Sequence, residues 1–170
     1  TAVSRALADL RDRVIGDLYE AALADLSESG PGGVGERAAL VAHGGYGRRD
    51  IAPYSDVDLM ILHPRPLAAR VAPVAERLLR DVFDASLVFG HSVRTADEAV
   101  RLAVADPTIG TSLVESRLLA GDAGLFKRYT RRLGREMVRR GRTLLGAIER
   151  ARLAERLRSG ETAFLLEPNV

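Results

Sequence analysis

The stretch from Val41 to Leu62 (VAHGGYGRRDIAPYSDVDLMIL) constrains the fold of this chain more than any other. A short apolar run ends in Gly44 and Gly45, and Asp56 and Asp58 follow a spacer of ten residues. Successive side chains of a β-strand point to opposite faces, so both carboxylates would share one face, about 7 Å apart. The opposite face would be anchored in the core by Val57, Leu59 and Ile61. Adjacent carboxylates repel each other, and a cation between them relieves that cost.

Composition favours an ordinary soluble chain with one domain, or a core domain with a helical appendage. The 170 residues are 46% hydrophobic and 28% charged, and no apolar run approaches the ~20 residues that span a bilayer. No charged and then apolar signal peptide opens the chain. The absence of cysteine excludes disulfides, thiolate zinc sites and cysteine nucleophiles. We therefore expect a cytoplasmic protein without a membrane partner.

Hydrophobic periodicity predicts strands and helices that interleave up to Arg94, with only helices after it. Thr95 and Glu98 form a capping-box pattern, and Asp106-Pro107 is typical of a helix start. Gly90, inside a predicted strand, indicates either a bulge or a close approach. The predicted helices cover 3–28, 67–83, 96–105, 107–120 and 126–159. The predicted strands cover 38–43, 56–63 and 86–94.

This order predicts an α+β chain with an α/β core and a helical C-terminal part. The core would consist of a small mixed sheet flanked by helices. We expect it to occupy residues 1–105, including the N-terminal helix, and a helical extension to occupy residues 106–170.

The glycine turn offers backbone N–H groups without side-chain obstruction. Gly44, Gly45, Tyr46 and Gly47 lead into a short predicted helix, and Arg48 supplies positive charge. Such a turn is suited to phosphate binding, although it matches neither the GxxxxGK[ST] loop nor GxGxxG. Alone, the glycines are weak evidence, since a glycine-rich turn after a strand is more often a simple turn. Beside a carboxylate pair that can hold metal at an α-phosphate, they favour nucleotidyl transfer.

Several further polar residues have two interpretations each. Ser55 either binds a phosphate oxygen or caps the turn before the strand. His91 and Arg94 either face the substrate or serve packing in the third strand. Glu115 and Arg117 either line the cleft or form a helix-surface pair. His43 and His63 flank strands without ligand spacing and are interpreted as structural.

Four ordered motifs make the chain resemble the nucleotidyltransferase domain of the bifunctional uridylyltransferase/uridylyl-removing enzymes that act on the PII nitrogen-signalling protein. They are GGYGRRDIAPYSDVDLMIL, GHSVRT at 90–95, DPTIGTSLVESRLLAGD at 106–122, and LEPNV at 166–170. The resemblance implies a polymerase-β-like nucleotidyltransferase fold and transfer of UMP from UTP to a tyrosine hydroxyl of PII. It implies Mg²⁺, with Mn²⁺ as an alternative, and a role in regulating nitrogen metabolism.

Matched by position, Asp56 and Asp58 fall on the family's catalytic metal pair. Gly44, Gly45 and Arg48 fall on its nucleotide loop. The family's chains are several times longer and continue into an HD hydrolase domain and ACT domains. We therefore expect this chain to be a piece of a longer protein, without the uridylyl-removing activity.

The chain departs from the family pattern at two places near the site. Related enzymes can carry a third acidic residue, Glu, where this chain has Val88. Arg49-Asp50 stands where the usual pattern is Gly-Glu. The missing carboxylate leaves open a degenerate nucleotide-binding module without catalysis. Because no local motif for uracil recognition is readable, a transferase with another nucleotide and acceptor is a further alternative.

The C-terminal part is strongly basic. Residues 126–158 hold twelve Lys or Arg and three Glu. Such a segment can mark a nucleic-acid surface, but this one has only Phe126 and Tyr129 to stack on a base. We interpret it as a solvated helix face, which does not favour a nucleic-acid partner.

Overall fold

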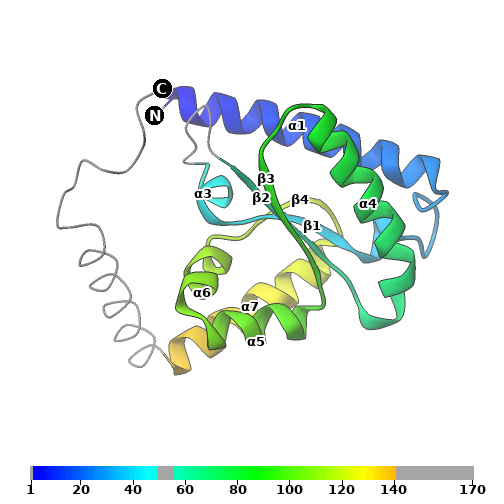
Figure 1. Ribbon diagram of the computed structural model, residues 1–170. Helices are drawn as coiled ribbons and strands as arrows, with labels where there is room; N and C mark the ends of the chain where they lie inside the picture. Colours follow the sequence, from blue (N-terminus) through cyan, green and yellow to red (C-terminus); the bar gives the residue numbers. More distant parts are fainter. Residues whose placement is uncertain (1, 50–55, 141–170) are drawn as a thin grey trace.

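The computed structural model describes residues 2–49 and 56–140, and its centre is a four-stranded mixed sheet (Figure 1). The strands lie in the order β3-β2-β1-β4. Strand β1 is antiparallel to both of its neighbours, and β2 and β3 are parallel. The strands are β1 (Ala39–Ala42), β2 (Val57–Leu62), β3 (Phe89–Arg94) and β4 (Arg117–Gly121).

Helices cover both faces of the sheet (Figure 1). One layer consists of α1 (Ala2–Asp25) and α4 (Ala68–Asp84), and the other of α5 (Ala96–Ala105), α6 (Pro107–Val114) and α7 (Ala123–Arg139). Short helical turns complete the described chain: α2 (Val34–Arg37), α3 (Gly44–Gly47) and η1 (Arg65–Leu67). Within residues 2–49 and 56–140, no helix combines the length and apolar character needed to cross a membrane.

Each face of the sheet has its own apolar core, because alternate strand residues point to opposite sides. On β1, Leu40 and Ala42 pack with α1 and α4, whereas Ala39 and Val41 pack with α5, α6 and α7. Both layers are needed because strands this apolar must be covered on both faces.

The structure confirms the predicted mixed α/β architecture and most of its elements. The predicted helices at 3–28, 67–83 and 96–105 and all three predicted strands are present, with ends that differ by a few residues. The capping box is formed: the hydroxyl of Thr95 accepts the Glu98 N–H, and the Glu98 carboxylate accepts the Thr95 N–H. The arrangement is compatible with the polymerase-β-like fold that the resemblance implied.

The prediction that only helices follow Arg94 was wrong. Helix α6 begins at Pro107 with Asp106 as its cap, but it ends at Val114 rather than near Ala120. The Ser116 hydroxyl donates to the Leu113 carbonyl and closes the last turn. The next residues form β4, which is hydrogen-bonded to β1. Pairing with a buried strand therefore overrides the helix-like spacing of RLLAG.

Part of the predicted C-terminal structure lies outside the described residues. Helix α7 accounts for the first half of the helix predicted at 126–159. The remainder of that helix and the LEPNV segment fall beyond residue 140 and are not described. The division of the chain at residue 105 stays a prediction.

Candidate functional site

The carboxylate of Asp58 lies between two glycine backbones. Asp58 is the second residue of β2, opposite Gly90 on β3, and Gly44 begins α3. A Cβ atom at Gly44 would lie 2.8 Å from Oδ2 of Asp58, and one at Gly90 would lie 2.8 Å from Oδ1. Both distances are too short for a real Cβ contact, so a side chain at either position would displace this carboxylate, whereas glycine leaves room for it. Of the two predictions for Gly90, close approach is confirmed, since the β2–β3 register is regular.

Asp56 immediately precedes β2 and is exposed, while Asp58 is half-buried. Strand alternation continued to the residue before β2 would keep the two on one face, which stays a prediction. Val57 and Leu59 are buried in the core on the opposite face, which confirms their predicted anchoring role.

A pocket of about 300 Å³ opens beside Asp58. Its walls come from the end of β1, from β2, from β3 and from α6. The polar or charged residues that line it are His43, Asp58, His91, Ser92, Arg94, Thr108 and Ser112. The pocket therefore combines one carboxylate, one guanidinium and several neutral donors within a single concavity.

His43, interpreted from the sequence as structural, lies in this pocket opposite Asp58. Its backbone N–H donates to the Asp58 carbonyl at 3.1 Å, and its Nδ1 shares a hydrogen bond of 2.8 Å with the Ser112 hydroxyl. Burial lowers the pKa of His43, and the Asp58 charge opposes that shift. Sequence reasoning missed His43 and Ser112 because their proximity depends on the β1–β2 register and on how α6 packs.

The two predicted residues of β3 differ in their placement. Arg94 shares the sheet face of Asp58, and its charge contributes to the lowered pKa of His43. His91 lines the pocket, but its ring lies beside Phe89, with centroids 5.8 Å apart, on the face toward α4. Alternation along the strand therefore places the Arg94 side chain on the sheet face of the Asp58 carboxylate and the His91 ring on the opposite face.

The glycine turn forms the one-turn helix α3. Gly44 has a φ of 60°, which glycine adopts without strain. A Cβ at Gly47 would overlap the carbonyl oxygen of Glu115, so this glycine lets the turn pack against the loop between α6 and β4. The first N–H groups of a helix lack intrahelical acceptors and can bind phosphate oxygens. Gly45 is half-buried and Arg48 is exposed, so both are accessible to a ligand.

Tyr46 and Ser55 are also among the residues predicted to bind the nucleotide. Tyr46 is fully buried and its ring packs in the core with α1, so its side chain is not available to a nucleotide. Ser55 lies outside the described residues.

The donor set is compatible with Mg²⁺ held jointly by protein and substrate. Within residues 2–49 and 56–140, no three His, Cys, Asp or Glu side chains are grouped to hold a metal. The Asp58 carboxylate accepts no hydrogen bond from another described residue, so its oxygens are available. Mg²⁺ is commonly bound by one or two carboxylates together with substrate phosphates and water. Two carboxylates, such as those of Asp56 and Asp58, fit that mode.

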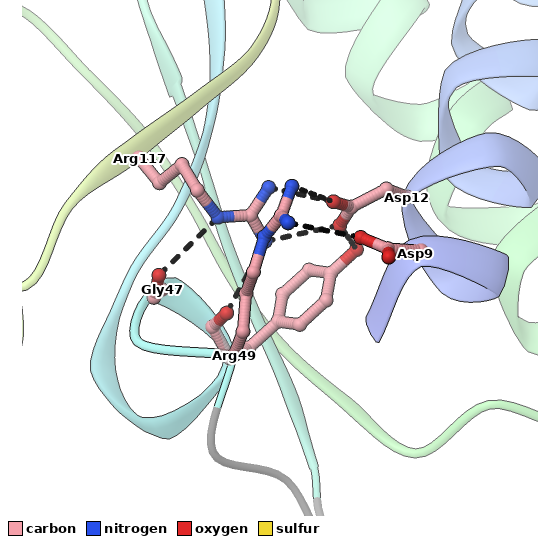
Figure 2. A network of polar contacts seen from close by, with 6 residues as sticks. Asp9, Asp12, Gly47, Arg49 and Arg117 are labelled. Carbon is pink, nitrogen blue, oxygen red and sulfur yellow. Dashed lines mark hydrogen bonds and ion pairs between the residues drawn. The ribbon is translucent and has the colours of Figure 1, made fainter. Parts of the chain in front are cut away.

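Glu115 and Arg117 are not on a helix, contrary to expectation. Glu115 caps the end of α6, and Arg117 begins β4 beside Ala42. Arg117 faces α1 rather than the pocket, and it contacts the glycine turn from behind (Figure 2).

Comparison with curated proteins finds a consistent set of relatives, although no family model matches the chain. A bifunctional uridylyltransferase/uridylyl-removing enzyme of Bradyrhizobium sp. (strain ORS 278) is 40% identical over 162 residues, which cover 95% of this chain and 17% of the relative. The protein of the same name from Azospirillum brasilense is 44% identical over 140 residues, which cover 80% of this chain and 15% of the relative. The protein of this name from Caulobacter vibrioides (strain NA1000 / CB15N) is 36% identical over 168 residues, which cover 98% of this chain and 18% of the relative.

The chain therefore spans less than a fifth of the length of these relatives. The matches extend over nearly all of this chain, at identities well above those of chance similarity. The chain belongs to the family of the bifunctional uridylyltransferase/uridylyl-removing enzymes, of which it corresponds to one segment.

Proposed function

We propose that this chain is a Mg²⁺-dependent nucleotidyltransferase domain that transfers UMP from UTP to a tyrosine hydroxyl of a PII-type regulatory protein. The observation that carries the proposal is the placement of the Asp58 carboxylate between Gly44 and Gly90. This placement joins a metal-binding group to a turn suited to phosphate. The names of the relatives support uridylyl transfer as the reaction.

In this proposal the reaction is an in-line displacement at the α-phosphorus of UTP. The tyrosine hydroxyl releases its proton to solvent, and its oxygen forms the new P–O bond. The bond from the α-phosphorus to the bridging oxygen breaks, and pyrophosphate leaves. Asp56 and Asp58 would hold the metal, which when bound neutralises charge on the phosphates. The first amides of α3 and the guanidinium of Arg48 would hold the outer phosphates. Arg94, on the pocket wall, would add positive charge near the reacting group.

The whole protein's partners also belong to the proposal. The relatives are much longer than this chain, which supports further domains in the same polypeptide. We propose that these include the HD and ACT domains implied by the resemblance, and that the protein works in the cytoplasm.

Replacement of the metal pair tests this function. Asp58→Ala and Asp56→Ala should each lower UMP transfer from radiolabelled UTP to PII by more than about 100-fold, because each removes a metal ligand. Circular dichroism should show the fold intact. Asp25→Ala, which removes a surface carboxylate paired with Arg77, is the matched control and should retain transfer. Undiminished transfer by either site variant would contradict the proposal.

A non-catalytic nucleotide-binding module is the second candidate, and one observation favours it. The β2–β3 register places Gly90 beside Asp58 and, continued by one residue, Val88 beside Asp56. Neither position supplies a third carboxylate. A titration with Mg-UTP that shows binding without pyrophosphate release would favour this candidate. Parallel titrations with ATP, CTP and GTP would test a transferase of different base preference.

A further inference from the structure

Three elements distant in sequence meet behind the glycine turn at the carboxylate of Asp12 on α1 (Figure 2). The Tyr46 hydroxyl donates to Oδ1 of Asp12 at 2.6 Å. The guanidinium of Arg117 on β4 donates to both carboxylate oxygens, at 2.7 and 3.0 Å. A bidentate pair of this kind fixes direction as well as distance.

Arg117 also holds the backbone of the turn itself. Its Nε donates to the Gly47 carbonyl at 3.2 Å, and its Nη2 donates to the Tyr46 carbonyl at 3.3 Å. The guanidinium carbon lies 5.5 Å from the centroid of the Tyr46 ring. The last carbonyls of α3 are therefore bound to a cation that is itself bound to α1.

Arg49 adds a further link between the turn and α1. It has a φ of 60°, a conformation that costs a non-glycine residue roughly 1–2 kcal/mol. Its guanidinium pairs with Asp9 at 3.0 Å and with Asp12 at 3.4 Å. These ion pairs explain how arginine is accommodated where the family pattern has glycine.

The contacts lie on the sheet face opposite the pocket. Arg117 pairs with Ala42, which packs in the core of α1 and α4, and Tyr46 is in the same core. The Asp12 and Arg117 side chains are only 18% and 22% exposed, so water screens their attraction less than that of a surface pair. None of these side chains lines the pocket beside Asp58.

We propose that Asp12, Tyr46 and Arg117 form a clamp that positions the glycine turn against Asp58 and thereby sets the affinity for the nucleoside triphosphate. The reason is geometric: Gly44, at one end of α3, touches the Asp58 carboxylate, and Gly47, at the other end, is held by Arg117. Because α3 is a single turn, movement of its end shifts its beginning. The three are positioning residues, and the inference rests on the proposed function.

The test uses two conservative variants of the full chain. Arg117→Lys keeps the charge but loses the branched guanidinium that donates to both the Asp12 carboxylate and the backbone carbonyls of α3. Asp12→Asn keeps the size of the side chain but removes its charge. Each should weaken Mg-UTP binding roughly tenfold, with kcat at saturating UTP little changed. The double variant should be little worse than either single one, because both act through one contact.

Arg70→Lys is the matched control. Arg70 pairs with Glu28, beyond the far end of α1, at 2.6 Å and does not touch the glycine turn. The Arg70→Lys variant should lose as much thermal stability as the Asp12 and Arg117 variants, or less. Its affinity for Mg-UTP should be unchanged. Loss of affinity confined to the Asp12 and Arg117 variants separates positioning from general stability.

Amide hydrogen exchange of the nucleotide-free protein provides a readout independent of catalysis. In Arg117→Lys, residues 44–49 should exchange faster while α4 and α5 keep their protection. Unchanged exchange there, or equal acceleration throughout the chain, would overturn the clamp. Wild-type protein that fails to bind Mg-UTP would instead overturn the proposed function, and exchange at residues 44–49 would still decide whether the clamp exists.

Discussion

Gly90 on β3 lies directly against the carboxylate of Asp58 on β2, so that a methyl group at residue 90 would come within 2.8 Å of Oδ1. The contact depends on the parallel register that pairs these two residues. It gives Gly90 a reason to be glycine that differs from backbone freedom: the position leaves space for the Asp58 carboxylate.

Gly90→Ala should therefore impair the site more than the fold. The added methyl would push the Asp58 carboxylate aside, and we expect UMP transfer to fall roughly tenfold or more. Because β3 is an edge strand, the melting temperature should change little. Gly134→Ala is the control, since a Cβ there meets nothing within 4 Å and should leave transfer intact. Full activity in Gly90→Ala would show that Asp58 tolerates displacement.

The strands of the site were predictable because their signal is local. Asp56 and Asp58 alternate with buried apolar residues, and that alternation specifies both the strand and its faces. The same holds for the capping box at Thr95, whose partners are three residues apart. Such features need no knowledge of distant segments.

The features that the sequence did not indicate depend on long-range pairing. Strand β4 contains RLLAG, whose leucines and alanine suit a helix, and only its pairing with β1 makes it a strand. His43 faces Asp58 because β1 and β2 are antiparallel in one particular register. Tyr46 was assigned to the nucleotide loop, yet the direction of its side chain depends on α1, which supplies Asp12.

The capping box at α5 makes a prediction about pH. The Thr95 backbone N–H, and then its hydroxyl, lower the pKa of the Glu98 carboxyl. A carboxylate with a lowered folded pKa stabilises the protein above its unfolded pKa, about 4.3, and this stabilisation is lost as pH falls through the folded pKa. The melting temperature of the wild-type protein should therefore exceed that of the Glu98→Gln variant at pH 7. The difference between the two melting temperatures should shrink below about pH 4. A difference independent of pH would contradict the assignment.

Two buried tyrosines should differ in how loss of the hydroxyl group changes the free energy of unfolding. Within the described residues, the Tyr19 hydroxyl is buried without a hydrogen-bond partner, whereas the Tyr46 hydroxyl donates to Asp12. An unsatisfied buried hydroxyl costs roughly 1–3 kcal/mol, so Tyr19→Phe should leave the free energy of unfolding unchanged or raise it by about 1 kcal/mol. Tyr46→Phe should lower it by a similar amount. Urea unfolding of both variants measures the contrast, and destabilisation by Tyr19→Phe would show that its hydroxyl has a partner.

Val88→Glu tests whether the missing third carboxylate limits activity. Val88 is 65% exposed, and its carbonyl accepts the Val57 N–H, which places it beside Asp56 at the start of β2. A glutamate there would share the face of Asp56 and Asp58 and supply another oxygen ligand. We therefore expect activity at lower Mg²⁺ concentration and a rate of UMP transfer raised by roughly tenfold. Val93→Glu is the matched control, because Val93 is also exposed on β3 but lies on the opposite face. A rise in both variants would indicate a general charge effect. No rise in Val88→Glu would mean that two carboxylates and the substrate phosphates already complete the site, because the added ligand then has nothing left to supply.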